Sequence, residues 1–123
     1  MTNMLPDIGR RIVNAKYVLE RASRLQDENA TMSLSISLLL MHDASELLML
    51  AVLDHLKAKT SKKREFMDFW DDVRNAAHPE PKHRIPMDSL NRIRIAFKHS
   101  GAIPNPSEVR GLLPRVQLLR GHA

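Results

Sequence analysis

The sequence predicts an all-α protein, an antiparallel bundle of four to five helices. Apolar residues recur at spacings of three and four along most of the chain, which is the period of an amphipathic helix. The 123 residues include only four glycines, and an all-β protein with many tight turns would need more. Aromatic residues make up 4% of a chain that is 43% hydrophobic, so the core must be mainly Leu, Ile, Val and Met. The length fits a single domain, residues 1–123.

The first two helices are expected over residues 7–27 and from Asn29 or Thr31 to residue 56. The first carries one apolar stripe, formed by Ile8, Ile12, Ala15, Leu19 and Ala22. The second opens with serines that alternate with apolar residues over 33–38, a pattern of period two that also suits a strand. We favour the helix because no turn signal separates this stretch from the helical spacing that follows. The second helix is apolar around much of its circumference, which predicts a central position.

The second half of the chain predicts shorter elements. A third helix should follow a cap at Thr60 or Ser61 and bury an apolar face that includes Phe66. Three prolines within residues 78–86 predict a linker. A fourth helix is expected over 87–100, ended by a left-handed Gly101. A fifth should start at Asn105, shortened or kinked by Gly111 and Pro114.

Composition excludes several classes of protein. The absence of cysteine excludes a disulfide scaffold, a thiolate metal site and a cysteine nucleophile. The N-terminal residues do not resemble a signal peptide. The most apolar stretch, residues 32–56, contains the ionisable side chains of His42, Asp43, Glu46 and Asp54, so we expect no membrane span and a cytoplasmic protein.

The positive charge is concentrated at one end of the chain. Residues 1–81 carry a net charge of −1 and residues 82–123 a net charge of +6. A basic segment of this kind favours a polyanionic partner such as RNA or a nucleotide.

The basic segment contains the main candidate for chemistry, Arg94 and His99. An arginine is a permanent cation, and histidine is the side chain that ordinarily titrates near neutral pH. Together they suit phosphoryl transfer on RNA: His99 would take the proton of a ribose 2′-hydroxyl or protonate the leaving 5′-oxygen. Arg94 would stabilise the charge on the phosphate, while Arg92 and Lys98 would bind flanking phosphates. Five positions on an ideal helix diverge by roughly 140°, so either a frayed last turn or a second subunit must bring the pair together.

Residues 90–104, with Arg94, His99, Ser100-Gly101 and a proline turn, resemble the HEPN (higher eukaryotes and prokaryotes nucleotide-binding) superfamily. The resemblance implies a small helical bundle, often a homodimer, and a metal-independent endoribonuclease of toxin or defence type. It also implies that Arg94 and His99 are the motif pair and that a second subunit completes the site. The residue after the arginine is usually polar in this family and is Ile95 here. That departure favours a second hypothesis, a non-catalytic binding or dimerisation module for a nucleotide, RNA or a partner such as an antitoxin or nucleotidyltransferase.

Other polar residues have auxiliary roles in these hypotheses. Arg74 and His78 share a helix face and either end a helix or form an additional phosphate-binding pair. His42 and Glu46 are one turn apart beside Asp43; two ligands do not make a site, so we predict no metal and no cofactor. If they face the cleft that contains Arg94, Glu46 would orient its guanidinium through a bidentate pair.

Overall fold

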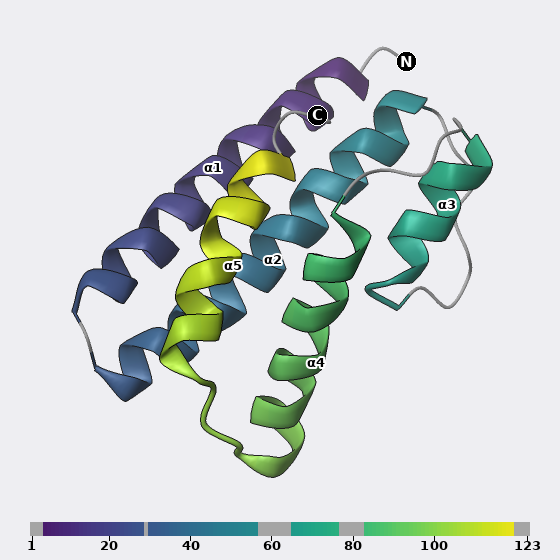
Figure 1. The fold of residues 1–123 in the computed structure, drawn as a ribbon. Coiled ribbons are helices and arrows are strands. Elements are labelled where there is room, and N and C mark those ends of the chain that lie inside the picture. The colour runs from purple at the N-terminus through teal and green to yellow at the C-terminus, as the bar shows by residue number, and fades with distance from the viewer. Residues whose placement is uncertain (1–3, 29, 57–64, 77–82, 120–123) are drawn as a thin grey trace.

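The computed structural model describes residues 4–28, 30–56, 65–76 and 83–119. In these ranges the chain forms five helices and no strand: α1 (Met4–Asp27), α2 (Thr31–Leu56), α3 (Asp68–Ala76), α4 (Arg84–Ser100) and α5 (Pro106–Leu118). Figure 1 shows α1 and α2 as long antiparallel neighbours, with α5 lying over both and α4 beside α2. The short α3 lies beside the C-terminal end of α2. The predicted all-α bundle is confirmed.

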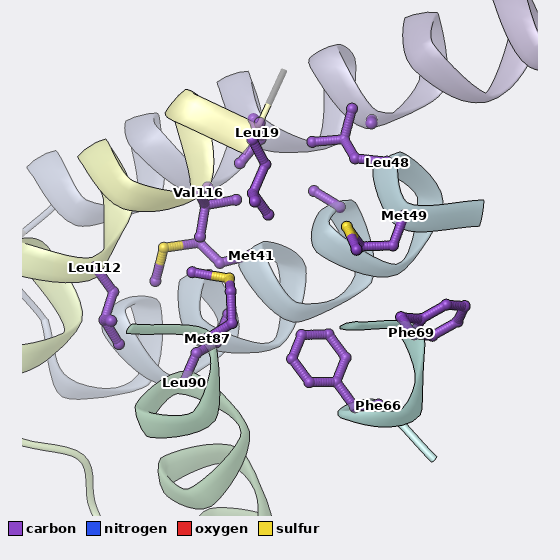
Figure 2. Packing of buried hydrophobic residues seen from close by; sticks show 14 of the residues in the cluster. Leu19, Met41, Leu48, Met49, Phe66, Phe69, Met87, Leu90, Leu112 and Val116 are labelled. Atoms are coloured by element: carbon purple, nitrogen blue, oxygen red, sulfur yellow. The ribbon is translucent and has the colours of Figure 1, made fainter. Parts of the chain in front are cut away.

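The helix α2 is the central element, as its nearly uniform apolar circumference predicted. Leu38, Met41 and Leu48 are fully buried on it, and Figure 2 shows Met41 close to Met87 of α4 and Val116 of α5. By length and composition α2 is also the one described helix that could cross a membrane, but most of its apolar stretch is buried inside the bundle. The other helices cover α2, and this burial accounts for its apolar character.

The serines near the start of α2 explain the pattern of period two. Ser35 donates its hydroxyl to the carbonyl of Thr31 at 3.0 Å. Ser37 donates to the carbonyl of Ala22 at 2.8 Å and accepts from Gln26 at 3.1 Å, both on α1. Each buried hydroxyl thus has a backbone or side-chain partner, so these residues fit a helix that packs closely against α1.

Several predicted boundaries were wrong. Helix α4 begins at Arg84 rather than at residue 87, because Pro86 falls in its first turn, where a missing N–H costs nothing. His83 precedes it in the left-handed region, at φ 73°. Phe66, expected within the third helix, lies in the turn before α3. The predicted caps Thr60 and Ser61 lie outside the described residues.

Two further boundaries concern the ends of the bundle. Helix α1 starts at Met4, three residues before the predicted start. Helix α5 runs through Gly111 and Pro114 to Leu118, so the expected shortening did not occur. The predicted caps between α4 and α5 are confirmed: Gly101 has φ 66°, and the side chain of Asn105 accepts from the N–H groups of Ser107 and Glu108.

Candidate functional site

The helix α4 carries the predicted motif on a firmly anchored backbone. Met87 and Leu90 are fully buried against the core, and Figure 2 shows both beneath α2 and α5. The helix is regular up to Ser100, so His99 lies in its last turn and not in a frayed end. Arg94 and His99 therefore diverge by roughly 140° around the helix. One chain does not bring the two together.

Arg94 lies on the side of α4 that faces α2. It is half-buried, and Lys98 follows it one turn later on the same side. Across from them stands Glu46 of α2, whose side chain is 40% exposed. The pKa of Glu46 is lowered, first by the interaction with His42 and then by the positive charges of Arg94 and Lys98, against an opposing effect of burial.

His42 connects the two helices beneath Glu46. Its side chain is 2% exposed, and its Nδ1 lies 3.2 Å from Oε1 of Glu46. Its Nε2 lies 3.3 Å from Oδ1 of Asn91 on α4. The ring of Phe66 covers one face of the imidazole at a centroid distance of 4.1 Å. Both ring nitrogens thus face oxygen atoms, one on α2 and one on α4.

The expected bidentate pair between Glu46 and Arg94 is not formed. Glu46 acts on the guanidinium through charge alone, with no ion pair within 4.0 Å between them. Within the part of the chain that the structure describes, the side chain of Arg94 forms no hydrogen bond or ion pair. A permanent cation that is half-buried and has an acidic neighbour beyond direct contact is a suitable receptor for an anion.

The opposite side of α4 forms a second surface. Arg92, Ile95 and His99 recur there at spacings of three and four and are all exposed. Arg92 pairs with Asp88 at 3.3 Å, one turn earlier. The two predicted phosphate-binding residues are therefore separated: Lys98 accompanies Arg94, whereas Arg92 accompanies His99.

The second predicted pair of arginine and histidine is described only in part. Arg74 lies at the end of α3, exposed, and its guanidinium is 3.5 Å from Asp71. The same carboxylate accepts from Arg84 of α4 at 3.0 Å. Arg74 thus belongs to a contact that ties α3 to α4. His78 lies outside the described residues.

Sequence reasoning missed Asn91 and Phe66 as neighbours of the site. Asn91 is three residues before Arg94, so its position on the same side of α4 followed from helical spacing alone. Its pairing with His42, 49 positions earlier in the chain, depends on how α2 and α4 pack. Phe66 was assigned to the core, and its contact with an imidazole ring has no signal in the sequence.

Comparisons with models of protein families, with curated proteins and with solved structures find no match to this chain. In the described part of the chain, five helices form a bundle. Glu46 of α2 and the basic Arg94 and Lys98 of α4 form a charged cluster between these two helices, and His99 lies on the outer side of α4.

Proposed function

We propose that this chain is a HEPN-like RNA-binding protein, a metal-independent endoribonuclease of toxin or defence type that acts as a homodimer in the cytoplasm. The observation that carries the proposal is the division of one regular helix into two surfaces. Arg94 lies on one surface, next to Glu46, and His99 lies on the other. Among the described residues of one chain, neither Arg94 nor His99 has its complement for this chemistry, and a two-fold related copy would supply both at once.

Exposed apolar residues support the dimer. Ile95 is 41% exposed and lies between Arg94 and His99 around the helix. On α2, Met32 and Ile36 are also exposed, and Leu39 is partly exposed on the same side of the helix. Contact through Ile95 would place His99 of one subunit next to Arg94 of the other, because both flank that side chain. Exposed apolar side chains are available for such a contact.

The chemistry follows from the roles of the two residues. His99 acts on a proton, either that of the attacking 2′-hydroxyl or that delivered to the leaving 5′-oxygen. Arg94 stabilises the additional negative charge on the phosphate as the new P–O bond forms. Lys98 beside Arg94, and Arg92 beside His99, bind flanking phosphates and make binding dependent on salt.

Cleavage of single-stranded RNA in excess EDTA tests the enzyme. We expect the wild type to cleave, and Arg94→Ala and His99→Ala each to lose at least about 100-fold in rate. Arg21→Ala, an exposed arginine on α1, is the matched control and should keep its activity. Mixing the two inactive variants should restore part of the activity, because a mixed dimer contains one intact composite site. Equal cleavage rates in all four proteins would show that Arg94 and His99 do not form the active site. If the wild type does not cleave RNA, the proposal that the protein is a ribonuclease is wrong.

The exposed Ile95 also favours a second function, a non-catalytic module that binds RNA, a nucleotide or a partner protein such as an antitoxin or nucleotidyltransferase. In that case the motif serves affinity rather than proton transfer. His99→Ala should then leave RNA binding intact, whereas Arg94→Glu or Lys98→Glu should weaken it strongly. Fluorescence anisotropy with labelled RNA at two salt concentrations measures this binding, and cleavage of RNA by the wild type in excess EDTA separates the first function from this one.

A further inference from the structure

A cluster of metal-ligating side chains lies on α2 beside the site. One ligand atom from each of His42, Asp43 and Glu46 lies within 4.8 Å of the other two. We propose that these three residues bind a first-row divalent metal ion of the zinc type. The proposal does not rest on the ribonuclease hypothesis, whose chemistry does not use this ion.

The buried imidazole provides the main argument. His42 is 2% exposed, and its Nε2 faces Oδ1 of Asn91 at 3.3 Å. In the tautomer that donates from Nε2 to this oxygen, Nδ1 carries a lone pair. Nδ1 makes no hydrogen bond to the described residues, yet it lies 3.2 Å from the carboxylate oxygen of Glu46. In that tautomer two electron pairs face each other at this distance, and a cation between them, a proton or a metal ion, removes their repulsion.

The separation of the two atoms fits a shared metal ion. Zinc binds imidazole nitrogen at about 2.0–2.1 Å and carboxylate oxygen at about 2.0–2.2 Å, so ligands at a tetrahedral angle are roughly 3.3 Å apart. The buried Nδ1 has no hydrogen-bond partner among the described residues, although Oε1 of Glu46 lies 3.2 Å away. Two ligands of one ion have this separation.

The surroundings hold the imidazole ready for binding. Oδ1 of Asn91 favours the tautomer with the proton on Nε2, as outer-shell residues do at zinc sites. Phe66 covers the ring at 4.1 Å and restricts its rotation. Asp43 is exposed and Glu46 is 40% exposed, so water can reach the ion and complete its coordination.

The charges of Arg94 and Lys98 act against cation binding. Both lie close enough to Glu46 to influence its carboxylate. A metal ion competes with them for the same negative charge. Removal of the positive charge at Arg94 should therefore strengthen metal binding. This effect is expected only if the metal ion binds next to Glu46.

Isothermal titration of the metal-stripped full chain with ZnCl2 tests the proposal. We expect one zinc ion per chain, with affinity reduced at least about tenfold in Glu46→Gln and in Asp43→Asn, and increased in Arg94→Ala. Glu20→Gln and His55→Asn, exposed residues of α1 and α2, are the matched controls and should bind as the wild type does. These changes avoid the buried His42, whose replacement endangers the fold.

Nitrogen NMR of the histidine rings gives a second measurement. Zinc should shift the Nδ1 resonance of His42, while the proton on Nε2 remains. The absence of saturable binding, or affinities in Glu46→Gln and Asp43→Asn equal to that of the wild type, would overturn the proposal. So would a protonated Nδ1 that persists when zinc is added, because a proton would then occupy the place of the metal.

Discussion

Glu46 shows how a single side chain acquires its properties from two helices. Its own helix contributes His42 one turn earlier, and α4 contributes Arg94 and Lys98. The pair on α2 was visible in the sequence as a spacing of four residues. The sequence predicted an effect of α4 on Glu46 only if α2 and α4 face each other at this point. The charge of Arg94 acts on Glu46 in the structure, and among the described residues no ion pair joins the two side chains.

The lowered pKa of Glu46 predicts a specific effect of acid on stability. A carboxyl group whose folded pKa lies below its unfolded value, about 4.3 for glutamate, stabilises the fold fully above the unfolded value. That contribution is lost as the pH falls below about 4.3 and through the folded pKa. Glu46→Gln should therefore be less stable than the wild type near neutral pH and should lose less stability on acidification.

Urea denaturation in the presence of a chelator, at pH 7 and at steps below pH 5, measures both effects. The exposed replacement Glu20→Gln serves as the comparison. Because Glu46 is 40% exposed, solvent screening keeps the difference small. Parallel stability curves for Glu46→Gln and the wild type would contradict the role assigned to His42, Arg94 and Lys98.

At the scale of single elements, local chemistry predicted the helix caps better than the helix starts. Gly101 and Asn105 act through their own backbone and side-chain atoms, so the residue type was sufficient. The start of α4 was missed because Pro86 permits either a linker or a first turn, and only packing decides. The position of Phe66 was missed for the same reason: its burial against His42 and Trp70 does not require it to be helical.

Two glycines should respond to alanine with opposite signs. Gly101 has φ +66°, and an added Cβ would meet nothing within 4 Å, so Gly101→Ala should cost about 1 kcal/mol of backbone strain alone. Gly111 lies inside α5, also with open space around it. Gly111→Ala should stabilise the fold by roughly 0.5–1 kcal/mol, because alanine has the higher helix propensity.

Thermal unfolding of the two variants beside the wild type checks this pair. The midpoint of Gly101→Ala should fall and that of Gly111→Ala should rise, by a few degrees each for a chain of this size. A gain of stability in Gly101→Ala would show that the chain between α4 and α5 does not need the left-handed conformation.

At the scale of the whole molecule, helical spacing in the sequence accounts for the buried residues, but it does not explain the apolar residues on the surface. The apolar stripe predicted for α1 is its buried side, where Ala15, Leu19 and Ala22 are at most 2% exposed. The same spacing gave no reason for apolar residues that remain exposed on α4, such as Ile85 and Ile95. Within the described residues no neighbour covers these side chains, and the sequence of one chain does not reveal how two copies would meet.

The dimer proposal makes Ile95 the residue on which assembly and activity both depend. Ile95→Glu would place a carboxylate on each side of a two-fold contact, where the like charges repel and lose their hydration. We expect this variant to change from dimer to monomer in light scattering coupled to size exclusion, with little loss of thermal stability, since Ile95 is 41% exposed in the single chain. Val13→Glu, an exposed apolar residue on α1, is the matched control and should remain dimeric. Cleavage of RNA should be lost together with the dimer, because His99 no longer reaches the Arg94 of a partner. An active monomer would contradict the composite site, and a dimer that survives Ile95→Glu would place the interface elsewhere on the bundle.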